Sequence, residues 1–103
     1  MFINLTPHQI DEQTTGLSIP STGIARIKMQ SRVIDTIDGV PLFHSYYAGN
    51  LEGLPEPVEG TIYIVSALAL NAVPTSRTDV VAPGDAVRDD KGRVIGCKGF
   101  RCR

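Results

Sequence analysis

The chain has 103 residues, of which 42% are hydrophobic and 20% charged, and its formal net charge is −1. This length fits a single domain, 1–103, and the composition excludes an intrinsically disordered chain, which combines low hydrophobicity with high net charge. The longest apolar run, 62–73, is about half the length of a membrane span, and no basic region followed by an apolar stretch opens the chain. We therefore expect a soluble, cytoplasmic protein without membrane contact.

The distribution of charge and the cysteine content limit the classes of partner and cofactor that we expect. Residues 1–87 carry four basic and nine acidic side chains, and residues 88–103 carry six basic and two acidic ones, which gives −5 and +4. Dedicated nucleic-acid binders usually carry a basic domain, so nucleic acid is not the expected partner. The two cysteines, Cys97 and Cys102, and the two histidines do not have the spacing of a zinc site, and we expect neither a metal nor a cofactor.

The first elements along the chain are short. Residues 2–5 are predicted to form a strand. Thr6-Pro7-His8-Gln9 then matches a helix capping box with proline at the first helical position, which predicts a single helical turn. Ile10 is the only aliphatic residue between His8 and Gly16, so no longer helix is expected.

Two extended segments and a hairpin follow. Residues 18–20 are predicted to be extended, and 23–29 alternate apolar and basic side chains as in a strand with one solvent-exposed face. Residues 32–38 and 40–47 are predicted to form a hairpin around Asp38-Gly39, because both residues tolerate positive φ. His44 shares a strand face with apolar neighbours and is predicted to be a buried, hydrogen-bonded histidine.

The second half contains the expected centre of the fold. Residues 48–60, AGNLEGLPEPVEG, read as a loop that is stiff at its prolines. Residues 61–65 are apolar throughout, which predicts a central strand covered on both faces. Ser66 is then expected to cap a helix over 67–73, which Pro74 ends.

The last elements complete the predicted fold. Strands are expected at 79–82 and 86–88 around a Pro83-Gly84 turn, followed by a hairpin loop at 89–92 and a last strand at 93–98. The predicted class is α+β and mainly antiparallel β, a small β-barrel or sandwich-like sheet with one short helix after a central strand.

Three polar segments are candidate anion sites, each with a structural alternative. Asn4, Thr6 and His8 can converge at a strand end on a phosphate or carboxylate, or simply hold a turn. Ser66 lies where a helix N-terminus offers free N–H groups, or is only a cap. Arg77 can bind an anion through two hydrogen bonds, or pair with a nearby carboxylate such as Asp79.

Catalysis has weaker support. The sequence contains no nucleophile elbow, no His-Glu-x-x-His helix and no phosphate-binding glycine loop. His8 and His44 can act as an acid–base pair only if the fold brings them together, so a small hydrolase or lyase is the third hypothesis after two binding functions.

Several blocks of the sequence resemble a family of small phage, prophage and bacterial proteins. They are INLTPH, IPSTGIAR, DGVPL, GLPEPVEGTIYIVSALA, DVVAPG and GRVIGC, in the family's order and over residues 3 to 97. The chain departs from the family after His8, where the polar QIDEQTTGLS replaces a longer alternating stretch. The polar family positions present here are Asn4, Thr6, His8, Arg26, Glu56, Ser66, Arg77 and Asp79.

The resemblance implies no settled activity, but the phage setting favours action against host defences. The leading hypothesis is a non-catalytic module, expected to be a homo-oligomer, that sequesters a small anionic, nucleotide-derived ligand. Its ligand-binding residues would be Asn4, Thr6, His8, Arg26, Ser66, Arg77 and Asp79, with Tyr46, Tyr47 or Tyr63 stacking on a base. The alternative is an inhibitor that binds a host protein through the 46–60 loop.

Overall fold

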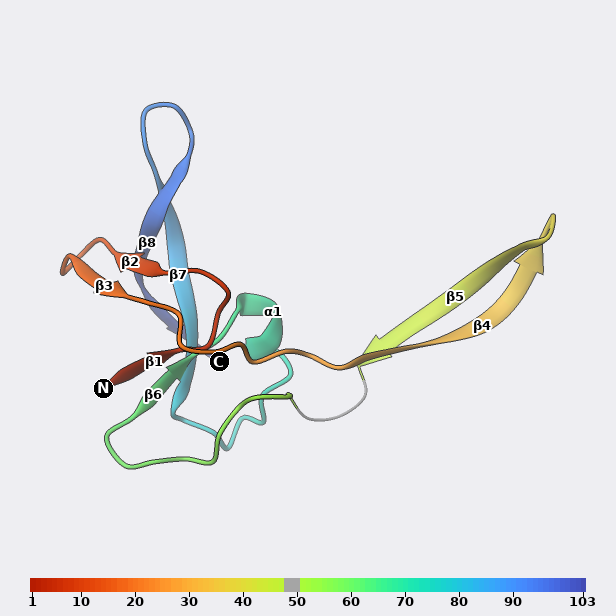
Figure 1. The fold of residues 1–103 in the computed structure, drawn as a ribbon, viewed down its shortest axis with the longest axis horizontal. Coiled ribbons are helices and arrows are strands. Elements are labelled where there is room, and N and C mark those ends of the chain that lie inside the picture. The colour runs from red at the N-terminus through yellow and green to blue at the C-terminus, as the bar shows by residue number, and fades with distance from the viewer. Residues whose placement is uncertain (48–50) are drawn as a thin grey trace.

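The computed structural model describes residues 1–47 and 51–103. It consists of a body, built around a six-stranded sheet, and an arm, a two-stranded sheet that projects away from the body (Figure 1). The extents are 54 × 40 × 21 Å and the Cα radius of gyration is 16.9 Å. A compact chain of this length has a radius of gyration of about 13 Å, so the projecting arm makes the molecule unusually extended.

The body is a mixed sheet that curls towards closure. Its order is β1-β6-β7-β8-β2-β3, made of β1 (Phe2–Asn4), β6 (Ile62–Ile64), β7 (Val80–Arg88), β8 (Val94–Cys102), β2 (Ile10–Glu12) and β3 (Leu17–Ile19). The longest pairing, β7 with β8, is antiparallel, whereas β6 is parallel to both neighbours. Beyond β3, Ser21 bridges to Asn4 of β1, which brings the two ends of the sheet together. The predicted class, mainly β and barrel-like with a short helix, is confirmed.

The core lies on both faces of β6, as the apolar run predicted. Tyr63 and Val65 pack in one cluster with the helix and with β7, while Ile64 faces the inside of the curled sheet against Val81 and Cys97. Ile64 and Val65 have no exposed surface. This strand is therefore the anchor from which the candidate residues on either side of it are positioned.

The helix is shorter than predicted. α1 (Ala67–Leu70) begins where Ser66 Oγ accepts the backbone N–H of Ala69 at 3.1 Å, so the predicted cap is confirmed. The helix ends at Leu70 and a turn continues to residue 73, because Val73 already inserts into the core. Within the described residues, no helix is long and apolar enough to cross a membrane.

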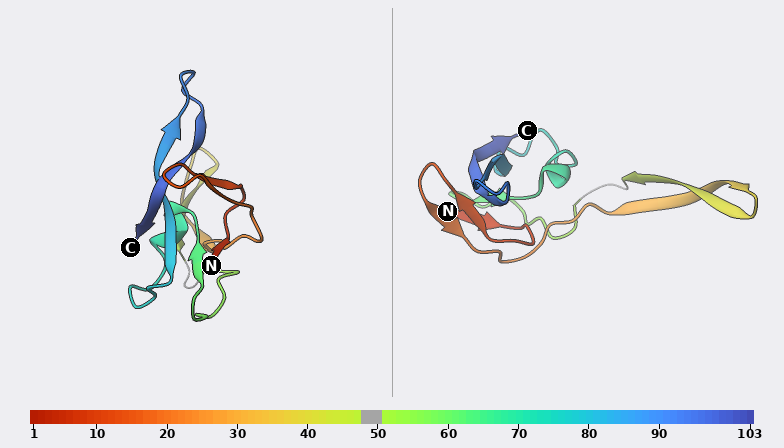
Figure 2. Two further views of the ribbon diagram at one scale, coloured as in Figure 1. Left: turned by 90° about the vertical axis from the view of Figure 1, so that its left-hand side faces the viewer. Right: turned by 90° about the horizontal axis from the view of Figure 1, so that it is seen from above.

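The arm is the hairpin that Asp38-Gly39 predicted. It consists of β4 (Met29–Ile37) and β5 (Val40–Tyr47), paired antiparallel, with φ of 51° at Asp38 and 78° at Gly39. These positive values are those of a tight primed turn. Figure 1 and the right-hand view of Figure 2 show the arm standing away from the body. His44 is consequently exposed, and the prediction that it is buried was wrong.

Two predictions on the N-terminal side were wrong. Thr6–Gln9 forms no helix, because the Thr6 hydroxyl bonds to Asn4 Oδ1 and the Gln9 side chain reaches Asp11 and Ser18. Strand β2 follows instead, which the sequence analysis missed. Residues 22–28 form no strand either. They connect the body to the arm and are held by a bridge between Arg26 and Glu52.

The C-terminal hairpin is longer than predicted, because Pro83-Gly84 is not a turn. β7 runs through both residues without a change of register: Pro83 pairs with Phe100 and Asp85 with Lys98. A Cβ at Gly84 would lie 2.1 Å from the carbonyl oxygen of Lys98, so only glycine permits this approach. β8 likewise continues to Cys102, beyond the predicted end at residue 98.

Candidate functional site

Asn4 and Thr6 are positioned by the end of β1, where the chain leaves the sheet. Asn4 is fully buried, and its Nδ2 donates to the carbonyl oxygens of His8 at 2.8 Å and Ile19 at 2.9 Å. Its Oδ1 accepts from the backbone N–H of Thr6 at 2.9 Å and from the Thr6 hydroxyl at 2.6 Å. An amide has two donor hydrogens and two acceptor sites, so Asn4 uses its full capacity within the protein. These two residues fasten the first turn to β3.

His8 lies at the exposed outer side of that turn. Its side chain lines a hollow of about 310 Å³, the His8 hollow, together with residues of β2 and β8 that include Asp11 and Cys97. Its backbone carbonyl is the group that holds the turn, by accepting from Asn4. The fold therefore places the His8 imidazole in solvent, with its backbone providing the structural contact.

Arg26 and Ser66 meet at a second hollow, which we call the Arg26 hollow. It measures about 390 Å³, and the other residues that line it are apolar: Leu5, Pro7, Ile24, Ala25, Ile27 and Leu68. Ser66 Oγ accepts from Ala69, which leaves its proton to donate outward. Arg26 is exposed on the segment that leads into the arm. Of the seven predicted site residues, these two are brought to one hollow.

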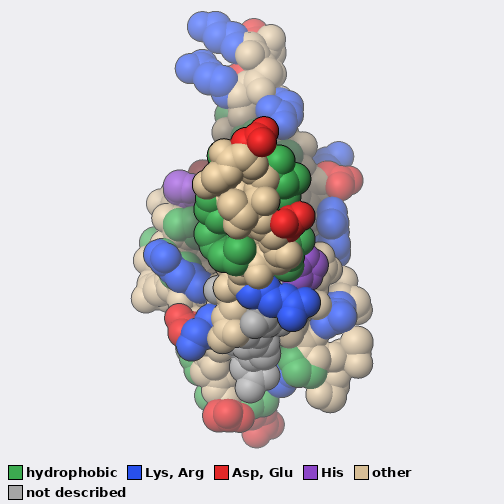
Figure 3. Space-filling view, turned by 90° about the vertical axis from the view of Figure 1, so that its right-hand side faces the viewer, with side chains coloured by type: hydrophobic (Ala, Val, Ile, Leu, Met, Phe, Trp, Pro, Cys, Tyr) green, Lys and Arg blue, Asp and Glu red, His purple; other side chains and the backbone are tan. Residues whose placement is uncertain are grey.

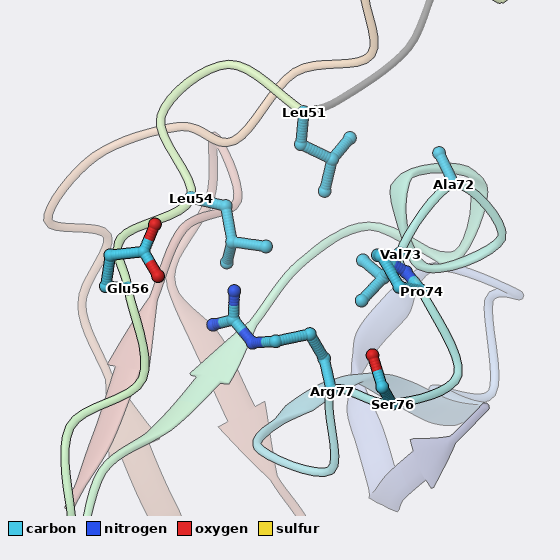
Figure 4. Close-up of a pocket in the computed structure, with 8 residues that line it drawn as sticks. All are labelled: Leu51, Leu54, Glu56, Ala72, Val73, Pro74, Ser76 and Arg77. Atoms are coloured by element: carbon cyan, nitrogen blue, oxygen red, sulfur yellow. The ribbon is translucent and has the colours of Figure 1, made fainter.

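Arg77 lines a third hollow of about 380 Å³, the Arg77 hollow (Figure 4). Its Nε and Nη2 donate to the two carboxylate oxygens of Asp79 at 2.8 and 3.0 Å, and Nη2 also reaches the carbonyl oxygen of Pro55 at 3.0 Å. The hydrogen bonds from Arg77 hold the pKa of the Asp79 carboxyl below its usual value. The guanidinium charge is thus compensated within the chain, and an anion here would compete with Asp79.

We expect Asp79→Ala to lower the free energy of unfolding by about 1.5–3 kcal/mol, the usual cost of losing hydrogen bonds to a charged partner. The side chains of Arg77 and Asp79 are only 19% and 16% exposed, so water replaces the lost bonds poorly. Urea unfolding at neutral pH measures the loss. The matched control is Asp85→Ala, because Asp85 is 92% exposed and lies 3.9 Å from Arg101. Equal stability of the two variants would contradict the structural role of Asp79.

The predicted residues do not form one site. His8, Ser66 and Arg77 line three different hollows, and Asn4 and Thr6 are occupied by the turn. His44 lies in β5 of the arm, whereas His8 lines a hollow beside β2 and β8 of the body, so the fold separates the two members of the proposed acid–base pair. Tyr63 is 2% exposed and presents no ring face for stacking.

The 46–60 loop is held against the body over the part that the structure describes. The side chains of Tyr46 and Tyr47, and residues 48–50, lie outside the described part of this predicted interface. From Leu51 onward the loop packs on the core through Leu51 and Leu54, and Tyr63 Oη donates to the Glu56 carbonyl at 3.3 Å. Residues 51–60 therefore serve to cover the body.

Glu12 is a buried carboxylate that the sequence analysis did not single out. It accepts from the hydroxyl and backbone N–H groups of both Thr14 and Thr15, and from the backbone N–H of Gly99 at 3.0 Å. The hydroxyl bonds from Thr14 and Thr15, followed by the Gly99 bond, hold its pKa far below the usual 4.5. The only signal in the sequence is the local Glu-x-Thr-Thr pattern, since Gly99 is distant along the chain.

We expect Glu12→Gln to lower the thermal unfolding midpoint at neutral pH, and the deficit to shrink as the pH falls. In the unfolded chain Glu12 has a pKa of 4.5 and binds a proton below that pH, whereas in the folded chain it stays ionised. The stabilisation that its charge provides is therefore lost as the pH falls. Scanning calorimetry between about pH 7 and pH 3 measures both chains, with the exposed Glu59→Gln as control. A deficit that stays constant over this range would contradict the assignment.

The arm carries a group of exposed apolar side chains that the sequence analysis did not predict. Its distal half exposes six hydrophobic side chains by 39–59% each: Val33, Ile34, Ile37, Val40, Leu42 and Phe43. Cross-strand register places Val33 beside Phe43 on one face, and Leu42 and Val40 on the other, with a bulge at Ile34. Figure 3 looks onto the arm tip and shows these hydrophobic side chains gathered around it. Both faces of the distal half of the hairpin thus carry exposed apolar side chains.

Metal ligands and cysteine thiols are the remaining groups that could carry chemistry. In residues 1–47 and 51–103, no group of three or more His, Cys, Asp or Glu side chains is arranged to hold a metal ion. Cys97 is buried and Cys102 exposed, and both are free thiols. In comparisons with known proteins, no protein-family model, curated protein or solved structure matches this chain.

Proposed function

We propose that the protein is a non-catalytic interaction module whose binding surface is the β4–β5 arm. The observation that supports this most strongly is the exposure of six apolar side chains on both faces of a hairpin that stands clear of the body. Monomeric proteins rarely expose a contiguous apolar patch of more than a few hundred Å², and larger patches mark binding sites for other molecules. The proposed partner is a protein, as in the second hypothesis from the sequence. The proposed binding surface is the arm, whereas the sequence hypothesis placed it on the 46–60 loop.

The physics of an isolated hairpin supports the same function. Two strands without a third neighbour or a packed face are at best marginally stable in water. A strand that is apolar on both faces is typical of positions covered on both sides. A surface that covers the arm would therefore stabilise the hairpin and bury its side chains in one step.

Site-specific photo-cross-linking in producing cells tests this function. A photoreactive residue replaces Val40 on the arm or, as the matched control, Val58 on the body, which have similar exposures of 58% and 56%. We expect a discrete protein adduct at position 40 and none at position 58. Equal yields at the two positions, or no adduct at position 40, would contradict the proposal.

A second candidate function is the binding of a small anionic, nucleotide-derived ligand in the Arg26 hollow. It is supported by Arg26 and the outward hydroxyl of Ser66 over apolar walls, in a volume of about 390 Å³. Known small-molecule sites have similar sizes and a few placed polar groups. In a phage protein such a ligand would be an immune signal withdrawn from the host.

The test is a thermal shift with nucleotides and cyclic dinucleotides. A ligand that binds the folded chain raises the unfolding midpoint by mass action. We expect Arg26→Ala to abolish the shift and Lys28→Ala, an exposed neighbour outside the hollow, to keep it. A shift that is the same in all three chains would rule out the Arg26 hollow.

A further inference from the structure

The charges on the arm are ordered along its length, which the proposed function does not explain. From the segment that leads into the arm to the arm tip, the exposed charged side chains run Arg26, Lys28, Arg32, Asp35 and Asp38. This part of the chain is therefore basic towards the body, where Glu52 beside Arg26 is the acidic exception, and acidic towards the tip. When two copies of the arm lie antiparallel, the basic part of each therefore faces the acidic part of the other.

Arg32 and Asp35 also lie on the same face of the hairpin. Arg32 pairs with His44 and Asp35 with Leu42, and residues 42 and 44 of β5 point to the same side. The bulge at Ile34 is what brings Asp35 onto the face of Arg32, because without it residues three apart would point to opposite sides. A single face thus presents a positive group, a negative group and an apolar tip of Ile37 and Val40.

We propose that the arm binds the arm of a second copy of this chain, antiparallel and around a twofold axis, so that Asp35 of each copy meets Arg32 of the other. This inference rests on the proposed function and names its partner. A twofold interface uses the same patch on both copies, and only an order of charges that reverses along the arm can satisfy it. The two reciprocal ion pairs set the register, and the apolar side chains beside them supply most of the attraction.

The available area is compatible with this partner. The face of Arg32 and Asp35 also carries Ile37, Val40 and Leu42, which are 39–58% exposed and leave on the order of 250 Å² of apolar surface per chain. Two arms that cover one another through this face would bury on the order of 500 Å² of apolar surface. Because little more than half of an interface is apolar, the total is on the order of 900 Å², near the lower limit for a specific interface. β4 rises about 3.3 Å per residue and spans roughly 26 Å, so the tip of one antiparallel arm would reach the base of the other.

Charge reversal tests the inference on the whole purified chain. We expect wild type to have twice the 11.1 kDa chain mass by light scattering after size exclusion. Arg32→Asp and Asp35→Arg each place like charges opposite one another, so each chain alone is expected at 11.1 kDa. Mixing the two variants makes both pairs complementary again and is expected to restore the double mass as a heterodimer. Lys91→Asp, a reversal at the exposed tip of the β7–β8 hairpin, is the control and keeps the wild-type mass.

Three results separate this inference from the function on which it rests. A mixture that stays at the single-chain mass, although wild type is double, overturns the antiparallel arrangement. Wild type at single-chain mass, together with a cross-link from position 40 to a different protein, overturns the second copy as partner and leaves the arm as the binding surface. Wild type at single-chain mass with no cross-link at position 40 overturns both.

Discussion

Asn4→Asp is expected to destabilise the body by about 3–5 kcal/mol, because two buried carbonyl oxygens lose their donors at about 1–3 kcal/mol each. The substitution keeps the shape and exchanges the Asn4 amide nitrogen for an oxygen that faces the carbonyls of His8 and Ile19. It also places a charge where no exposed surface remains. The total free energy of unfolding of a domain is about 5–15 kcal/mol, so urea unfolding would show the loss of a large part of the stability.

The control for this variant is Asn71→Asp, which makes the same chemical change at the exposed end of α1. A charge at such a helix end changes stability by less than about 1 kcal/mol. If Asn4→Asp unfolded at the same urea concentration as wild type, Asn4 would be free to serve a ligand, as the sequence analysis had suggested. The comparison therefore separates the structural role of Asn4 from a binding role.

Replacing Ile37 and Val40 together by serine is expected to weaken association of the arm about a thousandfold. The two side chains pair across the strands on the face of Arg32 and Asp35, and they are 53% and 58% exposed. In a twofold complex four apolar side chains are lost, at about 1 kcal/mol each for the part that becomes buried, which is roughly three factors of ten. Sedimentation equilibrium over a range of protein concentrations measures the change.

The matched control is Val58→Ser with Leu68→Ser, two body side chains of similar exposure, 56% and 55%. We expect this control to associate as wild type does. We also expect the arm variant to keep the thermal midpoint of the body, because none of the arm side chains that the structure describes belongs to the two core clusters. Equal weakening in both variants would show that general stickiness, and not the arm, causes association.

The elements governed by local chemistry could be predicted from the sequence. Asp38-Gly39 specified its hairpin through the positive φ that both residues tolerate, and Ser66 capped its helix where an apolar strand ended. The elements that failed depend on distant groups. Pro83 lies inside a strand because Gly84 lets the chain approach Lys98 and Gly99, which no local pattern of residues reveals.

The site was harder to predict for a related reason. Asn4, Thr6 and Arg77 are the residue types that bind anions, but the partner of each is decided by the fold, and here each finds one inside the chain. The apolar alternation of the arm correctly predicted strands. Alternation does not say whether a face is covered by the same chain, by another or by none, and the exposure of Val33 and Phe43 emerged only from the three-dimensional arrangement.

The central claim is that the arm is covered when the protein works, and amide hydrogen exchange measures this directly. We follow the cross-strand amides of β4 and β5, from Ser31 to Phe43, against those of β6 at rising protein concentration. A hairpin alone in water opens readily, whereas one packed on a partner is protected. The account predicts protection of the arm that approaches that of β6 at high concentration and falls on dilution. Exchange at the rate of an unstructured chain at every concentration would contradict it.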